Sequence, residues 1–220
     1  MKINGIENFK KLNFQKSFIL SALNLAFLGY KFKKKIKPKR NYLLWPDGEY
    51  ALKFGFDKKI PGRKLPHLIK LPCSISNIII YGNLEKKEKL FLYKKFKKKI
   101  IYCPLPHLNI DKLAFKIKKL PKKTFCIITL PTPKQEILAN IIARKSERYQ
   151  ILCIGGGLRM SLNEKKISSN FFVKNNLEFI WRLNNDFSRR LRRLLYSYFS
   201  YLFYVKIIYK KRASFIKKII

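Results

Sequence analysis

Short apolar runs alternate with amphipathic segments along most of the chain. Runs of about five residues, rich in β-branched and aromatic side chains and bounded by turn residues, predict buried strands. Between them, apolar residues recur every three or four positions, as Ile137, Leu138, Ile141 and Ile142 do, which is typical of a helix with one buried face. The predicted strands are Tyr42–Trp45, Asn77–Gly82, Lys99–Cys103, Thr124–Thr129 and Tyr149–Ile154, and the predicted helices are Tyr50–Gly55, Leu84–Lys98, Ile110–Leu120 and a segment that begins near Pro133.

Strands and helices that alternate at this spacing predict an α/β fold. We expect a Rossmann-like, mostly parallel sheet with helices on both faces. The apolar segment from Ser17 to Leu28 is compatible with either a strand or a helix. The basic segment from Lys31 to Arg40 is expected to be a solvated loop or a face turned toward anions.

The residues from Leu177 onward have a different pattern. Apolar positions recur every three or four residues from Leu177 to Val205, with arginines on the opposite side, which predicts a long amphipathic helix. Tyrosine and phenylalanine crowd into residues 196–209, and the segment carries eleven Lys and Arg against two acids. This composition suits the headgroup region of an anionic bilayer. We therefore expect an α/β domain over residues 1–176 and a membrane-associating helical appendage over residues 177–220.

Two other interpretations of this appendage remain open. A membrane-spanning helix needs about 20 apolar residues, and the apolar run from Leu194 to Tyr209 is shorter and is interrupted by Lys206. An ordinary helix packed on the core would leave the arginines solvated, but it does not account for the excess of aromatic residues.

Composition and charge limit the function classes. With 220 residues, 47% of them hydrophobic, the chain can bury one substantial core. Fifty Lys and Arg against twelve Asp and Glu give a net charge of +38, which calls for a polyanionic partner: nucleic acid, an anionic membrane or phosphorylated substrates. Heavy use of Lys, Ile, Asn, Phe and Tyr also resembles the bias of an AT-rich genome, which weakens the charge as evidence for nucleic acid. A basic nucleic-acid-binding protein of ribosomal type is the alternative class, but the chain has no RNA-binding signature and its basic residues do not gather into one module.

Cysteine and histidine positions argue against a metal site. The four cysteines are far apart, without a C-x-x-C pair, and fit buried thiols in a reducing compartment. His67 and His107 lack metal-ligand spacing, so a zinc site is not expected. We also expect no cofactor. The first apolar run lacks a small-residue cleavage site and is followed by a basic cluster, so we expect no secretory signal and a cytoplasmic protein.

Three segments that follow predicted strands could carry chemistry: Asp47 between Pro46 and Gly48, the turn Pro133–Glu136, and Gly155–Gly157. Because the carboxyl ends of parallel strands meet at one edge of a sheet, we expect the three segments at one rim. An ionised Asp47 there could accept a proton from a sugar hydroxyl or orient one, although an ordinary Asp-Gly turn is the simpler interpretation. The first turn of the helix near Pro133 could face an anion such as a nucleotide phosphate, or could be a plain connection. The glycines allow close backbone approach, but they lack the spacing of a dinucleotide-binding fingerprint.

Together the motifs resemble those of the WecG/TagA/CpsF glycosyltransferases. The resemblance covers roughly residues 43–198 and rests on the order and spacing of Pro46–Gly48, Pro133–Glu136, Gly155–Gly157, Leu177–Leu183 and Arg189–Arg193. It implies an inverting, metal-independent enzyme that moves a hexosamine-type sugar, such as N-acetylmannosamine, from a UDP donor to an undecaprenyl-diphosphate-linked sugar in surface polysaccharide biosynthesis of the cell envelope. It also implies a peripheral protein on the inner face of the cell membrane. The implied partners are the UDP-sugar donor, the polyprenyl-diphosphate-linked acceptor and the anionic membrane surface, and nucleic acid is not expected to bind.

The resemblance also implies roles for individual residues. Asp47 would be the general base and Gln135 a second catalytic residue that contacts a sugar. Substrate-binding residues would be Asn24, Arg63, Lys134, Glu136, Gly155 and Gly156, and residues for the acceptor diphosphate or the membrane would be Arg182, Arg189, Arg190, Arg192 and Arg193. Two positions depart from the family pattern, because Pro131 stands where a glycine is usual and Arg159 replaces an acid. A catalytically divergent member of the same family is therefore a further alternative.

Overall fold

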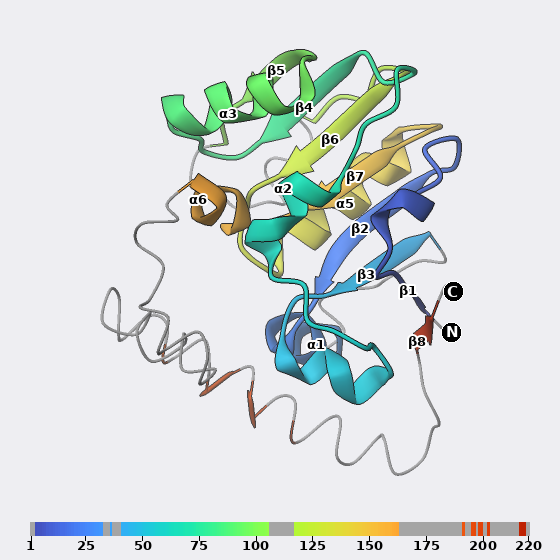
Figure 1. The fold of residues 1–220 in the computed structure, drawn as a ribbon, viewed down its shortest axis with the longest axis vertical. Coiled ribbons are helices and arrows are strands. Elements are labelled where there is room, and N and C mark those ends of the chain that lie inside the picture. The colour runs from blue at the N-terminus through green and yellow to red at the C-terminus, as the bar shows by residue number, and fades with distance from the viewer. Residues whose placement is uncertain are drawn as a thin grey trace.

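The computed structural model describes residues 3–32, 36, 41–105, 117–162, 191, 195–196, 198–199, 202 and 216–218. In this part of the chain every strand pairing is parallel, and seven strands lie in the order β5-β4-β6-β7-β2-β3-β1, with a short eighth strand, β8, beside β1 (Figure 1). The strands are β1 (Ile3–Gly5), β2 (Phe18–Leu23), β3 (Tyr42–Pro46), β4 (Asn77–Tyr81), β5 (Lys99–Cys103), β6 (Thr124–Ile128), β7 (Gln150–Cys153) and β8 (Ile216–Lys218). The expected α/β fold with a parallel sheet is confirmed.

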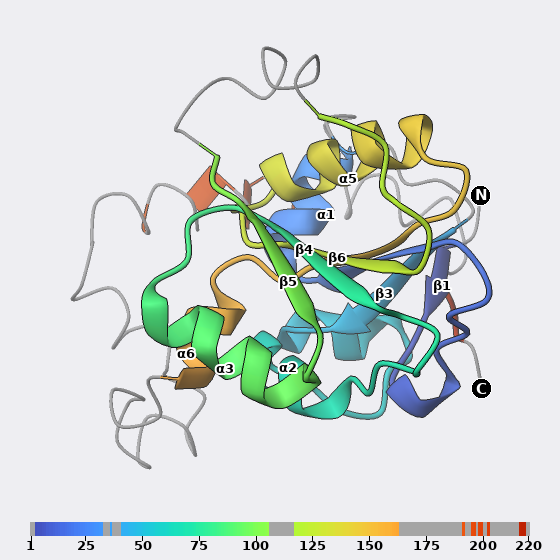
Figure 2. The same ribbon diagram turned by 90° about the horizontal axis from the view of Figure 1, so that it is seen from above.

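Helices cover both faces of the sheet (Figure 2). They are α1 (Leu25–Phe32), α2 (Leu65–Leu68), α3 (Lys86–Phe96), α5 (Lys134–Lys145) and α6 (Gly157–Leu162), with 3-10 turns η1 (Phe9–Lys11), η2 (Glu49–Phe54) and η3 (Gly62–Lys64). Helices α1 and α5 lie on one face, and α2, α3 and α6 lie on the other (Figure 2).

Two apolar cores follow from this layering. In β2 every residue is buried, and successive side chains enter opposite cores: Ile19 belongs to the core that includes Leu138 of α5, while Leu20 belongs to the core that includes Leu92 of α3. Strand side chains alternate between the two faces of a sheet, so a strand covered on both faces must be apolar throughout. This explains why the central strands are continuous apolar runs in the sequence.

The ambiguous segment from Ser17 to Leu28 contains both a strand and a helix. It forms β2 and then the first half of α1, and Asn24 separates the two. The Asn24 side-chain oxygen accepts a hydrogen bond from the Phe27 N–H at 3.0 Å, which is the contact of a helix N-cap. The predicted helix Tyr50–Gly55 is a 3-10 turn, η2, that ends at Gly55 in the left-handed conformation.

Other expectations stay partly untested. Most of the predicted helix Ile110–Leu120, most of the helix from Leu177 to Val205 and the five arginines between residues 182 and 193 lie outside the described residues. Residues 216–218, which we expected in a helical appendage, instead form β8, whose backbone pairs with the outer edge of β1. Within the described part of the chain, no helix is both long and apolar enough to cross a bilayer.

Candidate active site

Asp47 follows β3 and is held by two hydrogen bonds from different segments. Its Oδ2 accepts a bond from the Asn24 side-chain amide at 3.0 Å, and its Oδ1 accepts one from the Gly62 N–H at 2.7 Å. The side chain is half-buried. Two donors therefore fix the carboxylate plane, while the remaining lone pairs of both oxygens stay available to a further donor.

Asn24 connects Asp47 to helix α1. Because the Phe27 N–H can only donate, the Asn24 oxygen must face it, and the amide nitrogen must face Asp47. The residue that begins α1 is thus also the residue that orients the carboxylate.

Arg63 lies in η3 and follows Gly62, whose N–H binds Asp47. Its backbone carbonyl accepts a hydrogen bond from the Ser161 hydroxyl of α6 at 2.6 Å. A Cβ atom added to Gly157 would lie 3.0 Å from the carbonyl carbon of Gly62. Only glycine lets α6 approach η3 this closely, so the third residue of the triple glycine holds the Arg63 loop in place.

Gly155, two residues before Gly157, lies against the turn before α5. Its φ angle is +56°, and an added Cβ atom would lie 3.4 Å from the Leu130 carbonyl oxygen and 3.5 Å from the Gln135 Oε1. Gly156 is exposed, and no atom lies within 4 Å of the position of its Cβ. The glycines therefore connect the Asp47 and Gln135 segments through direct contacts, and the expected single rim at the carboxyl ends of the strands is confirmed.

Gln135 and Glu136 form a buried polar network at the start of α5. Gln135 Nε2 donates to Glu136 Oε1 at 2.8 Å and to Thr132 Oγ1 at 3.1 Å, and the Ser21 hydroxyl donates to the same Glu136 oxygen at 2.9 Å. Gln135 is 3% exposed and Glu136 is fully buried. Burial raises the pKa of the Glu136 carboxyl above its ordinary value, while the bonds from Gln135 and Ser21 oppose that rise. Among the described residues, Gln135 Oε1 and Glu136 Oε2 have no hydrogen-bond partner.

Two backbone N–H groups in the first turn of α5 already donate hydrogen bonds to carbonyl groups of the preceding turn. The Gln135 N–H donates to the Pro131 carbonyl at 3.3 Å, and the Ile137 N–H donates to the Pro133 carbonyl at 3.1 Å. The preceding Thr132–Pro133 peptide bond is cis. Because the N–H groups of Gln135 and Ile137 already have partners, this turn offers an anion fewer free donors than the sequence pattern predicts, and its exposed cation is Lys134.

Three further residues belong to this network and were not predicted from the sequence: Ser21, Thr132 and Tyr42. The Tyr42 hydroxyl lies 3.3 Å from both the Glu136 carbonyl oxygen and Asn140 Oδ1, and burial raises its pKa. Ser21 could have been found, because it is the one polar residue in the apolar strand β2. Nothing in the sequence connects it with Glu136, which lies 115 positions later.

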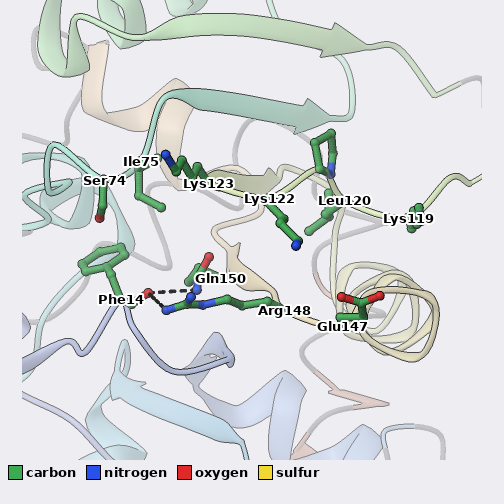
Figure 3. Close-up of a pocket in the computed structure, with 11 residues that line it drawn as sticks. Phe14, Ser74, Ile75, Lys119, Leu120, Lys122, Lys123, Glu147, Arg148 and Gln150 are labelled. Carbon is green, nitrogen blue, oxygen red and sulfur yellow. Dashed lines mark hydrogen bonds between the residues drawn. The ribbon is translucent and has the colours of Figure 1, made fainter.

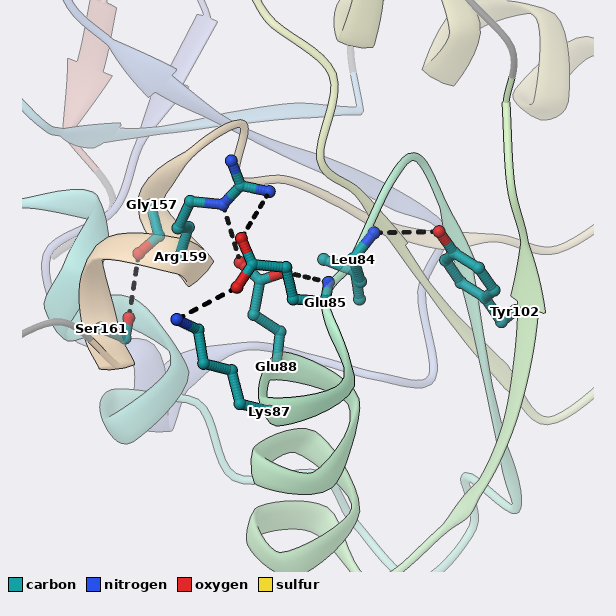
Figure 4. Close-up of polar contacts among 8 residues, drawn as sticks. All are labelled: Leu84, Glu85, Lys87, Glu88, Tyr102, Gly157, Arg159 and Ser161. Atoms are coloured by element: carbon teal, nitrogen blue, oxygen red, sulfur yellow. Dashed lines mark hydrogen bonds and ion pairs between the residues drawn. The ribbon is translucent and has the colours of Figure 1, made fainter. Parts of the chain in front are cut away.

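Arg159, which departs from the family pattern, binds two glutamates of the α3 N-terminus (Figure 4). Its Nε lies 3.3 Å from Glu88 Oε1 and its Nη2 lies 3.5 Å from Glu85 Oε1. Glu88 is buried and also accepts the Glu85 N–H at 2.6 Å, as in a capping box. The arginine therefore ties α6 to α3 and lies on the side of α6 that faces these acids.

A cavity of about 470 Å³ lies at the opposite edge of the sheet (Figure 3). It is lined by residues that precede β4, β6 and β7, among them Ile75, Lys123 and Arg148. The Arg148 guanidinium donates hydrogen bonds there to the backbone carbonyl oxygens of Phe14 and Gln15. None of the candidate residues lines this cavity, so it is separate from the site at the carboxyl edge.

Among the described residues, no group of three His, Cys, Asp or Glu side chains is placed to hold a metal ion. Arg182, Arg189, Arg190, Arg192 and Arg193 lie outside the described residues, so their places relative to Asp47 stay predictions.

Comparison with known proteins gives one result. Residues 102–214, more than half of the chain, match the model of the glycosyl transferase WecG/TagA/CpsF family. Neither the curated proteins nor the solved structures compared with the chain include a match. The matched segment includes Gln135, Glu136 and the triple glycine, whereas Asn24, Asp47 and Arg63 precede it.

Proposed function

We propose, since the chain belongs to the WecG/TagA/CpsF family of glycosyltransferases, that it transfers a hexosamine-type sugar, such as N-acetylmannosamine, from a UDP donor to a polyprenyl-diphosphate-linked sugar. Membership of the family makes the chain an enzyme that takes a sugar donor and a sugar acceptor. The identity of the two substrates, and the roles of the residues below, are our proposal.

The geometry of Asp47 carries this proposal. Its carboxylate is fixed by Asn24 and Gly62 at the rim where the Gln135 turn and the glycines also lie. A fixed carboxylate can take the proton from an acceptor hydroxyl as that oxygen attacks the anomeric carbon and the bond from this carbon to UDP breaks. The proton ends on Asp47, the electron pair leaves with the UDP diphosphate, and a single displacement inverts the anomeric carbon.

Other residues of the rim suit the donor. The leaving diphosphate gains negative charge, and the exposed Lys134 on one side and Arg63 on the other could offset it without a metal. The open surface at Gly156 lets a ligand approach the backbone closely, and Gln135 and Gly155 lie beside it. We assign the donor sugar to the space between Asp47 and Gln135.

The C-terminal segment suits the membrane-borne acceptor. Leu195, Tyr198 and Phe199 are exposed, at 44%, 40% and 63%, and such apolar side chains gain by entering a bilayer interface. Tyr196 packs against Tyr30 of α1, with ring centroids 5.3 Å apart, which ties this segment to the helix that Asn24 begins. We propose that the segment between residue 177 and β8 binds the inner face of the cell membrane and brings its arginines to the acceptor diphosphate.

A transfer assay on the full chain tests the proposal. The protein is incubated with UDP-N-acetylmannosamine, or other UDP-hexosamines in turn, and a polyprenyl-diphosphate-linked hexosamine, and both UDP release and the lipid product are measured. Loss of a general base typically costs a factor of 10² to 10⁴, so we expect Asp47→Asn to transfer at least about 100-fold more slowly. The matched control is Asp57→Asn, the same change at an exposed position, which should retain the wild-type rate. Equal rates for wild type and Asp47→Asn would remove Asp47 as the base.

A further inference from the structure

The donors and acceptors around Gln135 fix which way its amide points. Glu136 Oε1 is approached by three side chains: the Ser21 hydroxyl, the Thr132 hydroxyl and the Gln135 amide, at 2.9, 3.3 and 2.8 Å. Since this oxygen already accepts from two hydroxyls, it acts as an acceptor, and the amide group facing it must be the NH₂. The second N–H of that group is donated to Thr132 Oγ1, which leaves the hydroxyl hydrogen of Thr132 free to donate to Glu136. The network is consistent in one orientation of the amide.

That orientation aims the carbonyl oxygen of Gln135 away from Glu136 and toward the glycine turn. Gln135 Oε1 is buried, has no partner among the described residues, and lies 3.5 Å from the position of a Cβ atom on Gly155. A buried acceptor that stays unsatisfied is costly, and such an atom at a ligand site is satisfied when the ligand donates to it. Gly155 has no side chain beside this oxygen, so a ligand group that enters the glycine turn would meet less protein there than it would beside a larger residue.

We propose that Glu136 is a positioning residue, which together with Ser21 and Thr132 turns the Gln135 carbonyl oxygen toward the donor sugar, where it accepts a hydrogen bond from a hydroxyl or an acetamido N–H. This inference rests on the proposed function and adds to it a rule of substrate choice: the sugar must present a donor at this point. In Glu136→Gln the side chain at position 136 would offer both a donor and an acceptor. The Gln135 amide could then take either orientation, and the site would no longer require a hydrogen-bond donor on the sugar.

A purely structural role for Glu136 predicts something different. An acidic side chain in the first turn of a helix stabilises that helix through its dipole, and Glu136 is in the first turn of α5. If that were its whole role, its replacement would lower stability and would weaken all ligands of the site alike. Affinity for UDP, which lacks the sugar, separates the two roles from each other.

The test measures the affinity of the full chain for UDP and for a UDP-hexosamine by calorimetry, with the thermal midpoint of every variant. We expect Glu136→Gln to weaken the UDP-hexosamine about tenfold, the size of one hydrogen bond to a buried group, and to leave the UDP affinity within about a factor of two. The exchange variant Gln135→Glu/Glu136→Gln should bind the UDP-hexosamine more tightly than either single variant, because the amide at 136 then donates to the carboxylate at 135 and an oxygen again faces the sugar.

The matched control is Glu88→Gln, the same change at the buried glutamate in the first turn of α3, and it should alter neither affinity. Should the exchange variant fail to fold, Ser21→Ala removes one donor from Glu136 without reaching the sugar, and it should reproduce the selective loss.

Three results would overturn the positioning role while leaving the proposed function in place: an equal loss of UDP and UDP-hexosamine affinity in Glu136→Gln, no loss of either, or an exchange variant weaker than both single variants. A wild-type chain that binds no UDP-hexosamine would instead overturn the proposed function.

Discussion

Replacing Asn24 by aspartate tests how the Asn24 amide controls the charge of Asp47. The two side chains have the same shape, and aspartate is as good an N-cap as asparagine, so the bond from the Phe27 N–H to position 24 should remain. What changes is the atom that faces Asp47. An N–H donor 3.0 Å from Asp47 Oδ2 becomes a carboxylate oxygen.

The repulsion follows from that distance. Two unit charges 3.0 Å apart repel by about 1.4 kcal/mol in water and about 5.5 kcal/mol at an effective dielectric constant of 20. Because Asp47 is half-buried, we expect a value near the lower limit, about 1.4 to 3 kcal/mol. Each 1.4 kcal/mol is worth about one pH unit, so one of the two carboxyls should keep its proton to a pH about one to two units higher. A protonated base cannot accept the acceptor proton, so the acidic limb of the transfer rate should move to higher pH.

The assay is the rate of sugar transfer as a function of pH, for wild type, Asn24→Asp and Asn24→Ser. Serine keeps an N-cap oxygen but adds no charge, and its shorter side chain does not reach Asp47. Asn24→Ser should therefore be slower at every pH without a shift of the acidic limb. If the acidic limb of Asn24→Asp matched that of wild type, or if both variants showed the same shift, the Asn24 amide would not control the charge of Asp47.

Two further predictions concern the scaffold and the membrane. A Cβ atom on Gly82, whose φ is +134°, would lie closer than any contact distance to Thr129 Oγ1, so Gly82→Ala should lower the unfolding free energy in urea by about 1–3 kcal/mol. Gly156→Ala, with open space around its Cβ, should change it by less than about 0.5 kcal/mol, and equal effects would contradict the packing described. Burying a phenylalanine is worth about 1.5–3 kcal/mol, so Phe199→Ser should weaken sedimentation with anionic vesicles about tenfold or more. Tyr93→Ser, at an equally exposed aromatic residue of α3, should not, and an equal loss in both would argue against a membrane role for the segment around residue 199.

Much of the fold could be predicted because its strands are buried on both faces. The five predicted strands are β3, β4, β5, β6 and β7, and their apolar runs end within a residue or two of the observed bounds. The carboxyl ends of parallel strands meet at one edge, and this rule placed Asp47, the Gln135 turn and the glycines together. Elements of three to six residues, such as β1, α2 and α6, are too short to show a period and were missed.

The finer geometry of the site could not be predicted, because it depends on contacts between distant segments. The approach of Gly157 to Gly62 and the bond from Ser21 to Glu136 each join residues about a hundred positions apart. The pairing of Arg159 with Glu85 and Glu88 requires α6 and α3 to lie side by side, which no local pattern indicates. For the same reason the orientation of the Gln135 amide becomes clear only once all its neighbours are in place.

The most direct test of the proposed site is a crystal structure of the chain with a bound UDP-hexosamine. The proposed site requires the sugar at the carboxyl edge of the sheet, with one of its hydroxyl or amide groups within hydrogen-bond distance of Gln135 Oε1 and its anomeric carbon facing Asp47. A nucleotide bound instead in the cavity at the opposite edge, between Phe14, Ile75 and Arg148, would contradict it.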